Sequence, residues 1–290
     1  MRPGERGTAA EQLANLRRAV TALQPLLDEP GLVITHGNGP QVGNELLRQE
    51  RAAEEAPPLP LWLAVAQTQA EIGALISAEL RPALAGREPA CVLTHVRVAA
   101  DDPAFDRPTK PIGPFYSEEE ADQLERDRGW ALVSDANRGH RRVVPSPEPL
   151  EVIELDVIRR LAEGNAVVIA CGGGGIPVVR RGARLTGVDA VIDKDRASAL
   201  LADGLGAGRL VILTEVPAVY RRFGEPNAEE LRELSRADAE ALLPLLSEGS
   251  MRPKVESALA FAGETLITDF SSLDGALAGR AGTWIRGRVE

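Results

Sequence analysis

Short apolar runs alternate with amphipathic segments along most of the chain. Continuous apolar runs are typical of strands buried in a parallel sheet, and apolar positions three or four residues apart are typical of helices that cover it. Strands are predicted at residues 32–35, 91–98, 166–170, 210–214, 219–220, 265–268 and 283–285. Helices are predicted at residues 8–27, from 41, and at 61–80, 155–163, 196–205, 236–246, 249–262 and 271–278. This alternation predicts an α/β fold with a mainly parallel sheet.

Residues 101–149 interrupt the alternation and are predicted to form a small protruding lid inside a single domain that spans residues 1–290. The segment is rich in proline, with a charged helix predicted near 118–128 and short strands at 130–133 and 141–144. It is too irregular for a repeated strand–helix unit, and such long excursions often carry function. Lys110 lies between Pro108 and Pro111. This pattern fits both a lid lysine and one that is simply exposed.

The strand at 166–170 leads into Cys171 and four glycines, at residues 172–175. Glycines after a strand expose backbone N–H groups, which suit an anionic oxygen such as that of a phosphoryl group. A flexible turn is the alternative interpretation of four glycines. The segment Asp193-Lys194-Asp195 follows at the start of a predicted helix. A lysine there can neutralise the charge of a phosphoryl group during transfer, which favours a site.

A second glycine turn, His36-Gly37-Asn38-Gly39-Pro40, follows the strand at 32–35 and leads into a helix. A helix N-terminus of this kind is suited to anions. No serine or cysteine lies nearby in sequence to serve as a nucleophile for His36. A structural, hydrogen-bonding histidine is therefore favoured over a catalytic one.

The overall composition narrows the class of protein. The formal net charge of −10 disfavours binding to nucleic acid or to a membrane surface. The two cysteines, Cys91 and Cys171, lie on predicted buried strands and lack the spacing of metal ligands, so reduced thiols and no metal-binding residues are expected. The apolar runs are short of a membrane span and the N-terminus lacks the layout of a signal peptide, so a cytoplasmic protein is expected.

Several segments together resemble the carbamate kinases, within the amino acid kinase superfamily. They occur in the family's order, cover nearly the whole chain and begin at residues 33 (VITHGNGPQVGNE), 67 (QTQ), 108 (PTKPIGPFYS), 170 (ACGGGGIPVVR), 187 (GVDAVIDKDR), 213 (LTEVPAVYR) and 249 (GSMRPKVES). The PTKPIGPFY and CGGGGIP pieces are the most specific. The resemblance implies a three-layer αβα sandwich, a homodimer, and reversible phosphoryl transfer between ATP and carbamate with Mg²⁺. It also implies a place in arginine metabolism, where carbamoyl phosphate is commonly consumed to make ATP.

The resemblance also implies roles for particular residues. Lys194 would bridge the phosphates and stabilise the transition state, Asp193 would orient Lys194, and Lys110 would close over carbamoyl phosphate. Residues implied to face the transferring group are Gly37, Asn38, Gly39, Gly173 and Gly174. Residues implied to surround the nucleotide are Lys194, Thr214, Glu215, Val219, Tyr220, Met251 and Lys254, with Lys254 on its phosphates.

Three departures from the family pattern accompany the resemblance. The family begins with an apolar strand and a Gly-Gly-Asn turn, whereas this sequence starts with Met1-Arg2-Pro3-Gly4 where that turn would already have ended. We expect either an in-frame upstream extension of the encoding DNA that supplies the strand, or a 290-residue form of low activity and marginal stability. Glu215 and Pro217 stand where the family usually has aspartate, and Arg252 where it usually has glycine.

Three functional hypotheses remain open on the sequence. The first is a working carbamate kinase, which the presence of Lys110, Asp193, Lys194 and Lys254 favours. The second is a catalytically impaired homologue that binds nucleotide or carbamoyl phosphate as a sensor or subunit. The third is a kinase for another small carboxylate, since acceptor choice depends on the shape of the pocket.

Overall fold

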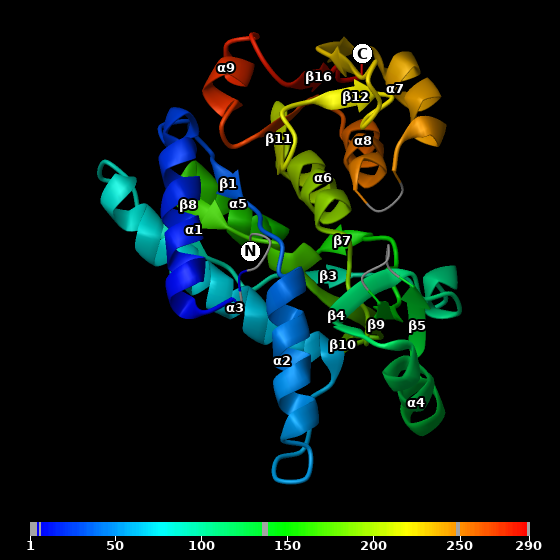
Figure 1. Ribbon diagram of the computed structural model, residues 1–290. Coiled ribbons are helices and arrows are strands. Elements are labelled where there is room, and N and C mark those ends of the chain that lie inside the picture. The colour runs from blue at the N-terminus through cyan, green and yellow to red at the C-terminus, as the bar shows by residue number, and fades with distance from the viewer. Residues whose placement is uncertain (1–4, 6, 135–138, 248–249, 289–290) are drawn as a thin grey trace.

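The computed structural model describes residues 5, 7–134, 139–247 and 250–288, with its elements labelled in Figure 1. Residues 1–4 lie outside the described residues. So does Gly249, the first residue of the segment GSMRPKVES that is expected to bind the nucleotide. None of the helices in the described part of the chain is long and apolar enough to cross a membrane.

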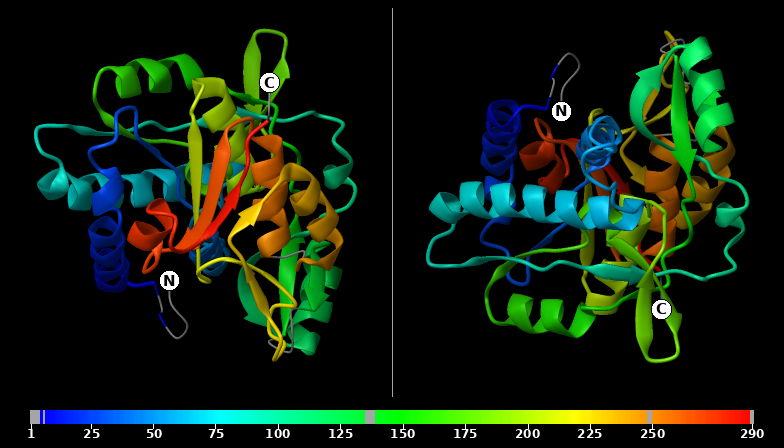
Figure 2. Two further views of the ribbon diagram at one scale, coloured as in Figure 1. Left: turned by 90° about the horizontal axis from the view of Figure 1, so that it is seen from above. Right: turned by 90° about the horizontal axis from the view of Figure 1, so that it is seen from below.

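A parallel sheet in the order β1-β8-β2 lies between helices from residues 9–205 and forms the core of that part of the chain. Its strands are β1 (Val33–Ile34), β8 (Val167–Ile169) and β2 (Pro89–Cys91). Val167 and Ile169 pack with α1 (Ala9–Ala22) and α3 (Leu61–Leu80), which lie side by side on one face (Figure 2). Val168 packs with α5 (Leu155–Glu163) and α6 (Lys194–Leu205) on the other face. This confirms the three-layer αβα architecture, because β8 is buried on both sides by helices.

Most of the helices begin and end near their predicted bounds. α3 and α5 match the prediction at both ends. The predicted helix at 8–27 is shorter, because α1 ends at Ala22 and Pro25 then lies in a 3-10 turn over Gln24–Leu26. α6 begins at Lys194 rather than at residue 196, with Asp193 as its N-cap. Lys194 therefore lies on the first turn of a helix.

A second sheet, in the order β10-β9-β3-β7, continues from the glycine turn. Its strands are β10 (Arg184–Gly187), β9 (Ile176–Arg181), β3 (His95–Arg97) and β7 (Glu151–Val152). The prediction of one strand at 91–98 is wrong, because β2 and β3 belong to different sheets. The chain bends between them where the Gln69 side chain accepts a hydrogen bond from the Thr94 N–H at 2.6 Å.

The C-terminal part contains a mixed sheet in the order β11-β15-β16-β14, drawn at the top of Figure 1. Its strands are β11 (Arg209–Thr214), β15 (Glu264–Asp269), β16 (Thr283–Ile285) and β14 (Glu233–Leu234). Helices α7 (Arg236–Leu242) and α8 (Met251–Ala260) pack on it, α9 (Leu273–Leu277) follows β15, and β12 (Val219–Arg221) pairs with β13 (Glu229–Leu231). β11 and β15 are parallel, so Thr214 and Asp269 are paired at their carboxyl ends.

The segment 101–149 forms an antiparallel sheet in the order β4-β6-β5 with one helix. Its elements are β4 (Lys110–Tyr116), α4 (Glu118–Arg128), β5 (Ala131–Ser134) and β6 (His140–Val144). The prolines of β4 concealed it in the sequence, and they are tolerated because β4 is an edge strand. β4 packs against α2 (Gly39–Arg51) so closely that a Cβ added to Gly43 would lie 2.8 Å from Gly113 Cα.

Candidate active site

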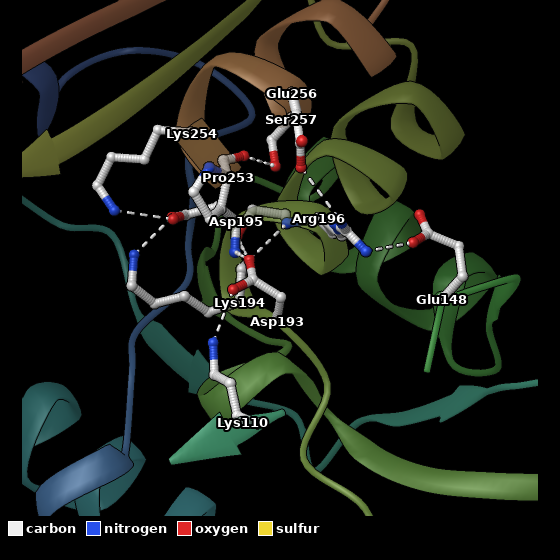
Figure 3. A network of polar contacts seen from close by, with 11 residues as sticks. Lys110, Glu148, Asp193, Lys194, Asp195, Arg196, Pro253, Lys254, Glu256 and Ser257 are labelled. Atoms are coloured by element: carbon white, nitrogen blue, oxygen red, sulfur yellow. Dashed lines mark hydrogen bonds and ion pairs between the residues drawn. The ribbon is translucent and has the colours of Figure 1, made fainter. Parts of the chain in front are cut away.

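Three lysines from distant parts of the sequence meet two aspartates at the start of α6 (Figure 3). Lys110 Nζ lies 2.8 Å from Asp193 Oδ2, Lys194 Nζ lies 2.5 Å from Asp195 Oδ1, and Lys254 Nζ lies 2.9 Å from Asp195 Oδ2. Lys110 comes from the first residue of β4, Lys194 from α6 and Lys254 from the first turn of α8. Ammonium groups outnumber carboxylates in this lysine cluster, so it is suited to an anionic ligand.

The lysine cluster contains every lysine of the chain. The sequence has 33 lysines and arginines, of which only Lys110, Lys194 and Lys254 are lysines. Arginine serves at all the other basic positions, including the surface ion pairs. An ammonium is a compact charge with three donors on a flexible stem, whereas a guanidinium is a planar fork. The restriction of lysine to this one place indicates that the site requires ammonium groups.

Asp193 caps α6 and faces Lys110 of β4. Its Oδ1 accepts hydrogen bonds from the N–H groups of Asp195, at 2.9 Å, and Arg196, at 3.3 Å, while its Oδ2 binds Lys110. Burial alone would raise the pKa of the Asp193 carboxyl, but the Lys110 ammonium and these N–H groups outweigh burial and hold the pKa below its usual range. The carboxylate that binds Lys194 directly is that of Asp195, and orientation of Lys194 by Asp193 stays a prediction.

Asp195 is absent from the site residues that the family resemblance implies, although it directly follows Lys194 in the sequence. It is 5% exposed, and its two oxygens bind Lys194 and Lys254. A buried carboxylate is stable only when it is paired, so the two lysines and Asp195 depend on one another. The Asp-Lys-Asp pattern indicates that an aspartate could bind Lys194. The position of the pattern at the start of a helix does not show which of the two aspartates points into the protein.

The two glycine turns meet beside Lys194. A Cβ added to Gly37 would lie 3.2 Å from Lys194 Cδ, and one added to Gly173 would lie 2.3 Å from the Asn38 side chain. Gly173 has φ +67° and Gly174 has φ +92°, a region that favours glycine. Their N–H groups donate to the carbonyls of His36 and Cys171, at 2.6 and 3.0 Å, and so hold the turns together. Contact of Gly173 and Gly174 with a substrate stays a prediction.

Helix α3 holds both turns through two buried polar side chains. Thr68 Oγ1 accepts a hydrogen bond from Asn38 Nδ2 at 3.0 Å. Gln69 Nε2 donates to the Gly172 carbonyl at 2.9 Å. Both residues are 1% exposed on the otherwise apolar buried face of α3, and polar residues on such a face are the signal that could have identified them as positioning residues.

His36 lies between the turns. Its Nδ1 is 3.1 Å from the Gly37 carbonyl oxygen, and a Cβ added to Gly172 would lie 2.3 Å from its Nε2. Burial lowers the pKa of His36, so the imidazole is neutral at pH 7. These contacts favour the structural role expected from the sequence.

The expected nucleotide residues occupy the carboxyl end of β11 and the elements that follow it. Thr214 ends β11, Glu215 follows it, and Val219 is fully buried with its N–H donating to Thr283 Oγ1 at 2.8 Å. The Tyr220 hydroxyl lies 3.3 Å from Glu230 on the paired strand β13. Met251 begins α8, which carries Lys254 into the lysine cluster. In parallel sheets, ligands bind outside the carboxyl ends of the strands, so this edge fits a nucleotide.

Few carboxylates near the lysine cluster could serve as ligands of a metal ion. Within the described residues, no group of three or more His, Cys, Asp and Glu side chains could hold a metal. Asp193 and Asp195 are both bound by lysines. Mg²⁺ usually needs only one or two protein carboxylates when substrate phosphates supply the other oxygens. The residues present therefore fit a metal that arrives with a nucleotide.

Comparison with known proteins gives one consistent result. A model of the amino acid kinase family matches residues 5–267. The chain is 45% identical to a carbamate kinase of Halobacterium salinarum, over 98% of this chain and 94% of that one, and 44% identical to carbamate kinase 2 of Staphylococcus epidermidis, over 95% and 94%. It also resembles the solved structure of a carbamate kinase from Giardia lamblia bound to AMP-PNP, with 38% identity, a TM-score of 0.89, and 99% and 94% of the two chains covered.

Proposed function

The chain belongs to the amino acid kinase family, and from that premise we propose that it is a carbamate kinase, which transfers a phosphoryl group reversibly between ATP and carbamate to give ADP and carbamoyl phosphate. The observation that supports this best is the lysine cluster, in which three separate segments bring ammonium groups to one point. The enzyme class is that of a phosphotransferase. In the cell we propose that it consumes carbamoyl phosphate to make ATP, within arginine metabolism.

The lysine cluster suits phosphoryl transfer because this reaction needs positioning and charge neutralisation more than a strong base. Lys194 lies on the first turn of α6, where the helix dipole adds to its positive charge. We propose that Lys194 neutralises the charge that develops on the transferring group. Lys254 binds the phosphates of the nucleotide, and Lys110 binds the carbamoyl phosphate. Asp195 holds the ammonium groups of Lys194 and Lys254 at fixed positions through its two ion pairs. Asp193 binds the Lys110 ammonium when the lid is closed.

The nucleotide would lie against the carboxyl ends of β11 and β15 and the start of α8, near Thr214, Glu215, Tyr220 and Met251. Val219 would support this edge from within, since it is buried. Mg²⁺ would arrive on the phosphates, with Asp193 and Asp195 as the nearest carboxylates, and it would neutralise phosphate charge. Gly37, Asn38 and Gly39, at the N-terminus of α2, would face the transferring group.

The assembly and location of the protein form a further part of this proposal. We assign a single domain with 101–149 as its lid, a homodimer, and a cytoplasmic location. Cys91 and Cys171 are both free thiols, as a reducing compartment permits. Exposed apolar side chains such as Leu93 and Leu185 are candidate contacts between subunits. Light scattering on the purified chain tests the dimer.

The decisive experiment mixes the purified chain with carbamoyl phosphate, ADP and Mg²⁺, and measures ATP with luciferase. We expect ATP formation that requires all three, and none from the Lys194→Ala variant beyond about one hundredth of the parent rate. ADP binding by calorimetry without ATP formation would support the sensor hypothesis instead. Faster ATP formation from acetyl phosphate than from carbamoyl phosphate would support a kinase for another small carboxylate.

A further inference from the structure

Arg196 follows Asp195 directly, but its guanidinium points away from the lysines and bridges two glutamates (Figure 3). Its Nη1 lies 2.7 Å from Glu148 Oε2, and its Nη2 lies 3.0 Å from Glu256 Oε2. The two partners are 48 and 60 residues from Arg196 in sequence, so the bridge joins three separate segments.

Glu148 lies at the point where the lid rejoins the rest of the chain. Its N–H donates to Asp102 Oδ2 at 3.0 Å, while Asp102 Oδ1 accepts from the Ala104 N–H at 2.8 Å. Asp102 and Glu148 stand at opposite ends of the segment 101–149, so this hydrogen bond closes the stem of the lid. The Glu148 carboxylate then joins that stem to α6 through Arg196.

Glu256 lies on α8, two residues after Lys254. Its second oxygen, Oε1, accepts a hydrogen bond from Arg252 Nε at 3.0 Å. Arg252 is the residue that stands where the carbamate kinases usually have glycine. The polar chain Asp102–Glu148–Arg196–Glu256–Arg252 therefore runs from the lid stem to the start of the helix that carries Lys254.

The backbone of Arg196 provides a second link to the lid. Its N–H donates to Asp193 Oδ1 at 3.3 Å, and Asp193 Oδ2 holds Lys110. A shift of the lid would therefore reach Arg196 both through Glu148 and through Asp193.

Building on the proposed function, we propose that Arg196 is a positioning residue that couples the lid to α8, the helix assigned to the nucleotide phosphates, so that ADP and carbamoyl phosphate strengthen each other's binding. Partly exposed ion pairs of this kind contribute little to stability. A guanidinium fork instead fixes the geometry of two carboxylates at once, which the rotatable ammonium of a lysine does less rigidly. Movement of α8 towards a bound nucleotide is thereby transmitted to the stem that positions Lys110.

The test measures KM for carbamoyl phosphate at low and at saturating ADP, and compares the two values. Coupling between two binding sites is typically fivefold or more, so we expect ADP to lower KM by about that factor in the parent. In Arg196→Gln the two values should agree within about twofold. Its kcat should stay within about threefold of the parent value, because all three lysines remain.

Arg286→Gln is the matched control, because Arg286 also bridges two glutamates, Glu233 and Glu264, at 2.6 and 2.9 Å in the C-terminal sheet. It should lose as much thermal stability as Arg196→Gln and keep the full effect of ADP on KM. Arg196→Lys should restore only part of the effect. Glu148→Gln added to Arg196→Gln should cause no further loss, because the two residues act through one contact.

The outcomes separate this inference from the proposed function. A parent chain that forms no ATP overturns the proposed function. An active parent whose KM does not depend on ADP, or an Arg196→Gln variant that retains the dependence, overturns the coupling role of Arg196 alone. An Arg286→Gln variant that loses the effect of ADP on KM as fully as Arg196→Gln also overturns the coupling role, because the loss would then come from lower overall stability.

Discussion

The carboxylate of Asp195 accepts a hydrogen bond from Lys254 at 2.9 Å, with both residues buried, so a buried ion pair joins α6 to α8. The same carboxylate holds Lys194 at 2.5 Å. Removing one partner of a buried pair leaves an uncompensated charge, which destabilises a protein more than a surface pair ever stabilises it. Asp195 therefore contributes both to the stability of the fold and to the arrangement of the two lysines.

Asp195→Asn should lower the free energy of unfolding by about 3 kcal/mol, because two ammonium groups lose their shared carboxylate. Turnover should fall by at least about a hundredfold, as for loss of one preorganised electrostatic group. Urea unfolding and the ATP assay measure the two effects. Asp274→Asn is the control, because its ion pair with Arg280 is exposed and 3.6 Å long. Equal stability of the two variants would contradict the role of Asp195.

Gly37→Ala should lower turnover by about tenfold through displacement of Lys194, since small misplacements of catalytic groups are costly. The added Cβ would lie 3.2 Å from Lys194 Cδ, so the lysine must move by a few tenths of an ångström. Gly208→Ala is the control, because nothing lies within 4 Å of its added Cβ. A Gly37→Ala enzyme with the parent kcat would show that Lys194 tolerates this shift.

Helices and strands whose apolar residues recur at regular spacing could be predicted from the sequence, because burial of those residues determines where each element lies. α3, α5 and β16 match their predicted bounds, and the glycine turns and Asp193-Lys194-Asp195 are adjacent as expected. β4 could not be predicted, because its prolines resemble those of a loop unless the strand is known to lie at a sheet edge.

Contacts between distant polar residues were harder to predict than the elements. The change of sheet between β2 and β3 depends on Gln69, which binds Thr94 from helix α3. The pairing of Arg196 with Glu148 and Glu256 depends on three segments that meet only in the folded chain. A sequence with 33 basic and 43 acidic residues permits many such pairs, and only the packing selects among them.

Lys110→Ala should raise KM for carbamoyl phosphate while leaving ADP affinity nearly unchanged. Lys110 reaches the site from β4 and contacts Asp193, whereas Lys254 reaches it from α8. The lid packs closely on α2 at Gly43, so movement of the lid relative to α6 stays a prediction. Calorimetric titration of ADP into the variant measures the affinity. A large loss of ADP affinity would place Lys110 on the nucleotide instead.

Stability should decline above neutral pH through His95. His95 Nδ1 lies 2.8 Å from Glu154 Oε1, and this hydrogen bond raises the pKa of His95 above 6.5 despite partial burial. The folded state then holds the proton more tightly than the unfolded state. The contribution is complete below pH 6.5 and is lost as pH rises through the folded-state pKa.

Urea unfolding of the parent and of Glu154→Gln between pH 6 and 9 measures this contribution. The difference in unfolding free energy between the two proteins should be largest at the acidic end and shrink as pH rises. The difference removes effects common to both, including that of His36. A difference that stays constant across this range would show that the His95 charge does not contribute.

The presence of only three lysines in the chain allows a direct test of the site by chemical labelling. The amines open to stable acylation in this sequence are those of Lys110, Lys194 and Lys254 and the N-terminal amine, because arginine guanidinium groups do not react under the same conditions. Lys194 and Lys110 have side chains 40% and 35% exposed, whereas Lys254 is 11% exposed. We expect Lys194 and Lys110 to be acylated first, with loss of ATP formation in proportion to Lys194 modification.

ATP with Mg²⁺ should protect Lys194 and Lys254 from acylation, and carbamoyl phosphate should protect Lys110, with mass spectrometry as the readout. Complete acylation of Lys194 in a fully active enzyme would exclude its ammonium from phosphoryl transfer, whatever the resemblance to the carbamate kinases.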